Sequence, residues 1–144
     1  MIEYDLQQWL AACEPVAALL GTGASTDPIR IYPCVFPQAP KAVAASYRRV
    51  STSRDHSTGD PGGLVAVVLE WVIFSPADNV NGYAAAKATA DAIRYALPPG
   101  NIQMGGTFVQ RITMDGERDE YDDEVRAFLV SFELTVIFTE SPPA

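Results

Sequence analysis

The first twenty residues repeat apolar side chains at the spacing of one helix face. This spacing predicts an amphipathic helix from Glu3 to Leu20. Pro15 falls inside it and, because proline lacks an N–H and clashes with the preceding turn, the helix is either kinked there or restarts with Pro15 in its first turn. Gly21 predicts the helix end. The apolar face consists of Leu6, Trp9, Leu10, Cys13, Ala17 and Leu20.

The strongest strand pattern in the chain runs from Leu64 to Ser75, where β-branched and aromatic residues make both faces nearly apolar. One face has no polar member, and we expect it to meet a helix. The other face carries Glu70, so it is either covered only partly or covered by a neighbouring subunit. We expect Trp9 and Trp71 to make core or helix-to-sheet contacts. The fully apolar face consists of Val65, Val67, Leu69, Trp71 and Ile73.

Three further segments predict strands: Val43 to Ser53, roughly Thr107 to Met114, and Val125 to Thr139. The last alternates strictly between apolar and more polar positions, which is typical of a half-buried strand. Its apolar positions are Phe128, Val130, Phe132, Leu134, Val136 and Phe138.

A second helix is predicted from about Val80 to Leu97, and its many alanines favour close packing on a sheet. The order of segments predicts an α+β domain over residues 1–144, with two helices on one face of a mostly antiparallel sheet of four to five strands. The apolar stripe of this helix consists of Tyr83, Ala86, Ala90, Ile93 and Leu97.

A proline-rich segment at about 27–42 separates the first helix from the strands. The stretch "DPIRIYPCVFPQAP" carries four prolines, each of which fixes its own φ and biases its predecessor toward extended backbone. The segment is therefore predicted to be an extended arm or edge strand, with Ile29 to Tyr32 as its apolar part.

The segment "DGERDEYDDE", Asp115 to Glu124, has seven acidic residues among ten. A segment of this composition cannot bury itself, so it is predicted to be a mobile, solvated hairpin loop between the last two strands.

The formal charge of −8 at pH 7 has the wrong sign for neutralising nucleic-acid phosphates. No calcium-loop spacing occurs, and Cys13 and Cys34 lack zinc-site spacing, so both are expected to be small buried residues. The N-terminus is acidic where a signal peptide is basic, and no apolar run is long enough to span a membrane. We expect a protein made in the cytoplasm, with no cofactor, metal or membrane partner.

The sequence offers little catalytic chemistry. The single histidine, His56, lies beside Asp55 and Ser57 in a segment of turn residues, and adjacency in a turn does not build a catalytic triad. A solvated acidic loop does not separate the pKa values of two carboxylates as a glycosidase requires. The glycines match no nucleotide-binding spacing. We therefore expect a protein that is not an enzyme; a small-ligand-binding or enzymatic domain, with its site between helix and sheet, stays open as the alternative.

The order of several segments resembles a known family. The run "EPVAALLGT", "RIYPCVFPQAP", "AASYRRVS", "VVLEWVIFS", "NGYAAAKATADAIRYAL" and "DEVRAFLVSFELTVIF" is similar to the tail completion or tail terminator family of long-tailed bacteriophages. It looks like the branch shared by prophages and gene transfer agents. The resemblance spans nearly the whole chain, which departs from it in the longer "GTGASTDP" gap and in its acidic final hairpin.

The resemblance implies a structural virion protein that forms a hexameric ring. Such a ring caps the tail tube at its head-proximal end and joins it to the head-tail connector or stopper protein. DNA then passes through the ring without specific binding. Acidic residues that face the bore would repel DNA phosphates. The acidic segment is expected either to line the bore in this way or to reach axially toward the tube or connector, and its charge does not choose between the two.

Two sets of contact residues follow from this resemblance. A stiff arm loses little entropy when it docks, so the arm is expected to help close the ring, unless it lies only on its own domain. The candidate subunit-interface residues are Ile29, Ile31, Tyr32, Pro33, Val35, Phe36 and Pro37. The candidate tube, connector or lumen contacts are Arg54, Asp55, His56, Asp115, Glu117, Asp119, Glu120, Asp122 and Asp123.

Overall fold

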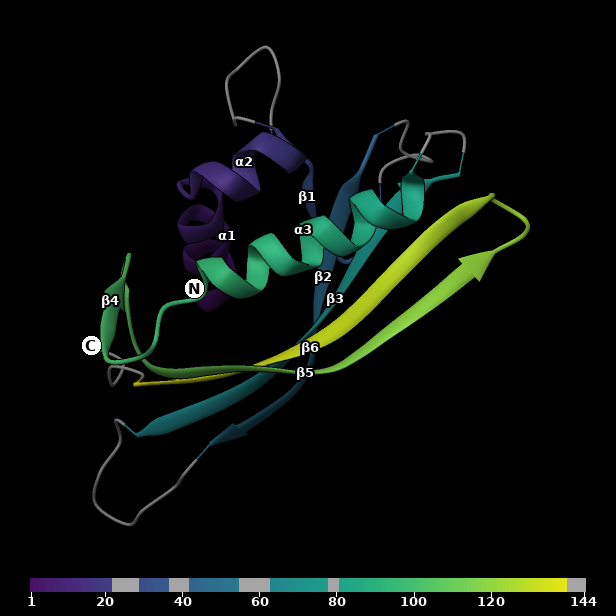
Figure 1. Cartoon of the computed structure of the whole chain (residues 1–144). Helices are drawn as coiled ribbons and strands as arrows, with labels where there is room; N and C mark the ends of the chain where they lie inside the picture. Colours follow the sequence, from purple (N-terminus) through teal and green to yellow (C-terminus); the bar gives the residue numbers. More distant parts are fainter. Residues whose placement is uncertain (22–28, 37–41, 55–62, 78–80, 140–144) are drawn as a thin grey trace.

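The computed structural model describes residues 1–21, 29–36, 42–54, 63–77 and 81–139. Three helices and six strands follow one another along these residues (Figure 1). The elements are α1 (Ile2–Ala11), α2 (Glu14–Leu20), β1 (Ile31–Pro33), β2 (Ala44–Arg54), β3 (Leu64–Pro76), α3 (Gly82–Ala96), β4 (Ile102–Met104), β5 (Thr107–Asp122) and β6 (Ala127–Thr139).

All six strands form one sheet in the order β1-β2-β3-β6-β5-β4. Neighbouring strands are antiparallel except at the edge, where β1 runs parallel to β2. The β2–β3 and β5–β6 hairpins extend to opposite ends of this curled sheet (Figure 1). The α+β class with a mostly antiparallel sheet is thus confirmed.

The numbers of helices and strands differ from the prediction of two helices and four to five strands. The helix predicted from Glu3 to Leu20 is two helices, because Pro15 stands in the first turn of α2, where its missing N–H costs no helical hydrogen bond. This confirms the restart rather than the kink. The extra strand is β4, whose three residues, one of them polar, are too few to give a periodic signal.

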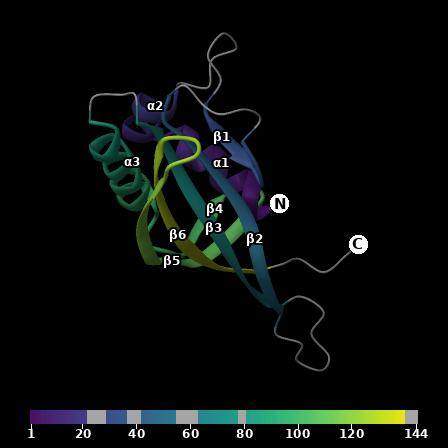
Figure 2. The same cartoon turned by 90° about the vertical axis from the view of Figure 1, so that its right-hand side faces the viewer.

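The three helices gather on one side of the sheet, as the two views in Figures 1 and 2 show together. The face of β3 that lacks polar residues is fully buried beneath them, as predicted, and so are the alternate positions of β6 from Val130 to Phe138. The centre of this core is an aromatic row across three strands. Trp71 stacks on Tyr47 with ring centroids 5.1 Å apart and on Phe132 at 6.3 Å.

Polar contacts fix the helices on this sheet. The indole N–H of Trp9, a residue that packs half-buried against the core, donates to the carbonyl oxygen of Ala96 at 2.8 Å. The buried Thr107 hydroxyl donates to the Asp5 carboxylate. Gly105 turns beside this pair with a φ of +57°, and a Cβ there would lie 2.6 Å from Asp5 Oδ1. A glycine at this turn therefore lets β4 and β5 approach α1 closely.

The acidic segment is not a loop. β5 continues through it to Asp122 and pairs with β6 across a bulge between Asp115 and Arg118; the turn itself is only residues 123–126. Gly116, with a φ of +67°, lies in this bulge. The segment forms a strand because β6 supplies backbone partners on both sides of the bulge, while most of the acidic side chains stay exposed.

Two smaller expectations were also wrong. Cys34 is exposed rather than buried and has a φ of +66°, at the point where the chain leaves β1; Cys13 is half-buried. Tyr83, placed by its spacing in the apolar stripe of the second helix, is 45% exposed. Its ring meets that of Phe128 edge to face, with centroids 5.8 Å apart, and its hydroxyl donates to the carboxylate of Asp119.

Candidate assembly surfaces

The arm lies along its own domain over its described part. β1 pairs with β2 at the edge of the sheet, as the prolines predicted, and Ile31 is buried in the core. Ile29 packs half-buried against the same core. Tyr32 is half-buried and contacts Phe36, whose ring in turn meets Phe74, with centroids 5.4 Å apart.

Two arm residues proposed for a subunit contact remain at the surface. Pro33 is exposed and Val35 is 71% exposed. Pro37 and the rest of the arm lie outside the described residues. The exposed surface of the described arm therefore centres on Val35.

Arg30, which the sequence reading did not single out, attaches the arm to the domain. Its Nε donates to the carbonyl oxygen of Val43 at 2.8 Å, and its terminal amino group donates to that of Leu19 at 2.9 Å. Its backbone N–H also donates to Leu20, and its carbonyl accepts from Ala45. The motif that joins "LLG" to "RIYP" thus has a physical role, because one guanidinium connects the end of α2 to the start of β2.

The acidic half of β5 is tied to α3 by a polar cluster. The Tyr83 hydroxyl donates to one carboxylate oxygen of Asp119, and Lys87 Nζ lies 3.2 Å from the other. The same ammonium lies 3.2 Å from Glu117. The hydrogen bond from Tyr83 and then the one from Lys87 lower the pKa of Asp119, and the bond to Asp119 raises the pKa of Lys87.

We expect Asp119→Asn to remove part of the acid sensitivity of the fold. Because the folded pKa of Asp119 is depressed, its contribution is complete above the unfolded pKa of about 4 and is lost as pH falls through the lower folded value. Exposed ion pairs are worth about 0.2–1 kcal/mol each, so the loss at pH 7 should stay below about 1 kcal/mol. Urea unfolding at pH 7 and below pH 4 gives the free energy of unfolding of wild type and variant. If this free energy falls between the two pH values by as much in Asp119→Asn as in wild type, the cluster does not contribute to the acid sensitivity.

The other acidic candidates play different roles. Asp122 accepts from the backbone N–H of Glu124 and shapes the β5–β6 turn, and Asp115 accepts from Gly116 at the bulge. Within the described part of the chain, the carboxylates of Glu120 and Asp123 have no polar partner. Arg54 is the last residue of β2, which β3 and β6 separate from β5 in the sheet. Asp55 and His56 lie outside the described residues.

A row of charged residues crosses the sheet face that the helices leave open. Arg48, Glu70, Glu133 and Asp115 stand directly opposite one another on β2, β3, β6 and β5. Arg48 Nε lies 3.1 Å from Glu70. Glu133 is exposed between two other carboxylates. The sequence contained all four residues, but only the strand register aligns them.

Neutralising Glu133 should stabilise the isolated chain. Like charges directly opposite on neighbouring strands are unfavourable by about 0.2–1 kcal/mol, so we expect Glu133→Gln to raise the free energy of unfolding by a few tenths of a kcal/mol at low salt. The gain should shrink at high salt, because salt then screens the repulsion in the wild type as well. Glu120→Gln, opposite the apolar Leu129, is the matched control and should change little. A destabilised Glu133→Gln variant would contradict the repulsion.

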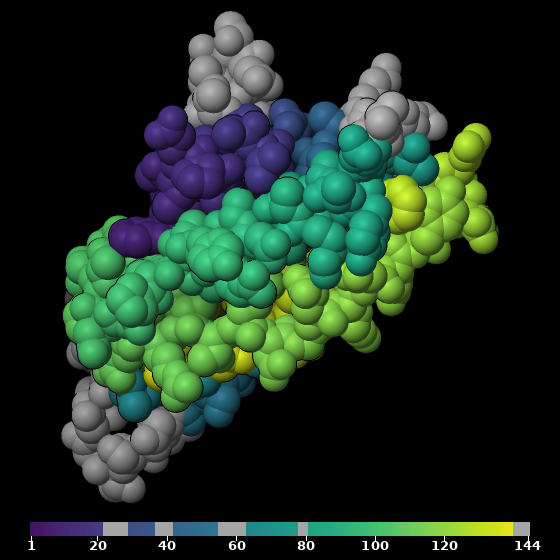
Figure 3. Space-filling view, viewed as in Figure 1, coloured from purple at the N-terminus to yellow at the C-terminus, as the bar shows by residue number. Residues whose placement is uncertain are grey.

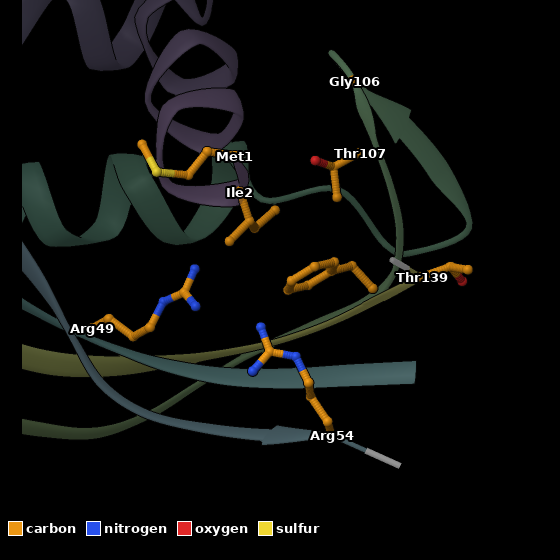
Figure 4. Close-up of a pocket in the computed structure, with 8 residues that line it drawn as sticks. Met1, Ile2, Arg49, Arg54, Gly106, Thr107 and Thr139 are labelled. Carbon is orange, nitrogen blue, oxygen red and sulfur yellow. The ribbon is translucent and has the colours of Figure 1, made fainter. Parts of the chain in front are cut away.

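A hollow of about 350 Å³ lies between α1 and the sheet. This is the place where the alternative reading, a small-ligand-binding or enzymatic domain, predicts its site. Figure 4 shows Arg49 and Arg54 reaching from the sheet toward α1. Arg49 Nε lies 2.6 Å from Glu3. Among the described residues that line it, no side chain is a carboxylate, imidazole or thiol, so these residues supply no side-chain general base. Its lining residues are Met1, Ile2, Arg49, Arg54, Gly106, Thr107, Phe138 and Thr139.

A second hollow, between the start of α2 and the end of α3, is mainly apolar and is lined by Cys13, Pro15, Ala92, Tyr95 and Ala96. Burial raises the pKa of the Cys13 thiol. Because the thiolate is the nucleophile, this environment disfavours covalent chemistry. Across the described ranges, no three His, Cys, Asp or Glu side chains cluster as a metal site would require. None of the described helices has the length and apolar character needed to cross a bilayer.

The fold as a whole has a counterpart among solved structures. A chain from the virion of a native gene transfer agent particle matches it with a TM-score of 0.67 over 94% of this chain and 92% of that one, at 16% identity. This chain has the fold of a gene transfer agent virion protein. A second solved structure, whose name states no function, matches at a TM-score of 0.55 and 18% identity over 99% of this chain and 93% of that one.

At the level of sequence, a scan against protein-family models finds no match. A search of curated proteins also finds none. The likeness therefore concerns the fold, and it extends over nearly the whole chain.

Proposed function

We propose that this chain is a structural virion protein of the tail completion or tail terminator type. Six copies form a ring that caps the head-proximal end of the tail tube and joins it to the head-tail connector. The observation that carries the proposal is the nearly full-length fold likeness to a chain of a gene transfer agent virion. The resemblance of the "RIYP" segment and of the alanine-rich helix to the tail terminator family supports the same assignment.

A structural role agrees with the chemistry of the two hollows. The described lining of one contains two arginines and no side-chain general base, and the described lining of the other contains one thiol, whose pKa burial raises. The conspicuous polar features of the molecule lie instead on its sheet face and along its strands. Those are surfaces for contact with other proteins.

The open sheet face is the best candidate for the lining of the bore. Each copy would present Glu70, Glu133 and Asp115 there, with only Arg48 as a compensating charge in the row. Carboxylates repel DNA phosphates, particularly in a narrow channel where their fields add. DNA would then slide through the ring without sticking.

The β5–β6 hairpin supplies an axial contact in this proposal. Its tip projects beyond α3 in the space-filling view (Figure 3), and it carries Asp123 and Glu124, both exposed. The tip replaces the longer loop expected from the sequence as the part that reaches toward the tail tube or connector.

The location of the chain in particles tests the proposal. In cells that produce the particle, an affinity-tagged copy should co-purify with tail tube protein, and electron microscopy should place one six-fold ring at the head-proximal end of each tail. Deleting the gene should yield heads and tails that do not join. Tagged protein found in heads or at the distal tail end, or normal joining without the gene, would overturn the proposal.

A further inference from the structure

Two strands of the sheet have long edges that no other described strand covers. β1 covers β2 only at Ala45–Tyr47, so, among the described residues, 48–54 have an open edge. β4 covers β5 only at Thr107–Val109, and Asn101 bonds to Gln110, so residues 112–122 have an open edge within the described structure. Open edges present unpaired backbone groups that another strand can pair with.

The two open edges carry opposite charge. The β2 edge contains Arg48, Arg49 and Arg54 and no acidic residue, and all its side chains are exposed. The β5 edge contains five carboxylates against the single Arg118. Within the chain, Glu70 and Glu3 already pair with Arg48 and Arg49, and Lys87 pairs with Glu117 and Asp119. The carboxylates of Asp115, Glu120 and Asp122 still make contact between two β5 edges unfavourable, so the β2 edge, which brings no carboxylate of its own, is the better partner for β5.

The strand directions suit the pairing of unlike edges. β2, β3, β6 and β5 are successively antiparallel, so β2 and β5 run in opposite directions. When a second copy is placed beside the first in the same orientation, its β2 lies antiparallel to the β5 of the first copy. The alternation then continues from copy to copy without a break, as closure of one sheet around a ring requires.

The covered parts of the two edges favour a stagger. Following the register across the sheet, β2 at Arg54 is level with β5 at Val109, whereas the open edge of β5 extends away from this level to Asp122. Without a shift, the open stretches face each other only between residues 48–52 of β2 and 112–115 of β5. A shift along the strands lets the rest of the two stretches face each other. Such a shift is the shear that any closed, tilted sheet needs. It also brings the half-exposed Val50 and Tyr121 into the junction.

We infer that a second copy of this chain docks its basic β2 edge on the acidic β5 edge of the first, head to tail, and so continues one sheet around the ring. This inference rests on the proposed ring and adds the strands that close it. The contact is heterologous, so each copy uses both edges, once each.

Cysteine crosslinking tests the inference. In a background with Cys13→Ala and Cys34→Ser, Ser51→Cys on β2 is combined with Thr113→Cys or with Glu120→Cys on β5, two positions that span the open edge. A short bis-maleimide is added to the assembled ring, either free in solution or on isolated particles. We expect at least one combination to give a ladder of linked chains on a denaturing gel.

Each single-cysteine variant should give only monomer, because in a head-to-tail contact a position does not face itself. A mixture of two single variants should give dimers without higher bands. Ser51→Cys combined with Ala88→Cys, exposed on α3, controls for random collisions.

The outcomes separate the two proposals. An intact six-fold ring without a ladder from either combination, or single variants that crosslink as well as the double ones, would overturn the edge pairing and leave the ring in place. If the uncrosslinked wild-type chain is monomeric by native mass and is also absent from tail ends, the proposed function itself fails.

Discussion

Trp71→Ala is expected to remove a large share of the stability of the fold. Trp71 is 1% exposed, and its ring lies between those of Tyr47 and Phe132 at the centre of the sheet. Truncation of a buried tryptophan costs about 3–5 kcal/mol through lost burial and a residual cavity. Because domains are stable by only about 5–15 kcal/mol, the variant should be marginal or unfolded at 37 °C.

The conservative variant Trp71→Phe distinguishes packing from polarity. The indole N–H of Trp71 is buried with no hydrogen-bond partner within the described structure, and an unsatisfied buried donor costs about 1–3 kcal/mol. Phenylalanine keeps a ring in the row and removes this donor, so it should cost much less than alanine. Trp71→Phe as damaging as Trp71→Ala would contradict this account of the row.

Guanidinium unfolding followed by circular dichroism measures both variants. Tyr4→Ala, at a position on α1 that is 58% exposed, is the surface control and should stay within about 0.5 kcal/mol of wild type. If Trp71→Ala unfolds at the same guanidinium concentration as wild type, the aromatic row is not the centre of the core.

Much of the core could be predicted from the sequence, because buried residues repeat every second position in a strand and every three to four positions in a helix. β3 and β6 alternate at a period of two, and α3 repeats at helical spacing, so most of their buried residues followed from the pattern; in α3 the exposed Tyr83 and the buried Thr89 did not. The buried status of Trp71 was predicted in this way. Its stacking partners were not, because Tyr47 and Phe132 meet it only through strand register, which the sequence alone does not fix.

The features that the sequence missed depend on contacts between distant segments. The acidic half of β5 is a strand because β6 pairs with it and because the single charge of Lys87 lies between two of its carboxylates. The row from Arg48 to Asp115 and the open edges of β2 and β5 likewise exist only once the strands are ordered. Local composition, which suggested a loop, contains none of this information.

The arm gives the second large prediction, at Arg30. Arg30→Ala removes two hydrogen bonds from a charged group, one to each of the Leu19 and Val43 carbonyl oxygens. Hydrogen bonds to charged groups contribute about 1.5–3 kcal/mol each, and such losses are only partly additive. The variant also loses a cation near the C-terminal end of α2, where the helix dipole favours one. We expect a loss of about 2–4 kcal/mol in the free energy of unfolding.

Arg30→Lys tests whether the two-carbonyl geometry matters. A lysine ammonium is a compact charge on a flexible stem and lacks the planar fork that reaches two carbonyls at once. Lysine should therefore recover only part of the loss, and the arm should be cut by protease sooner than in wild type while β3 and β6 remain protected in hydrogen exchange. If lysine restores full stability, the charge at the end of α2 is the essential feature and the fork is not. If alanine has no effect, β1 is held by its strand pairing with β2 and by Ile31, and Arg30 does not anchor the arm.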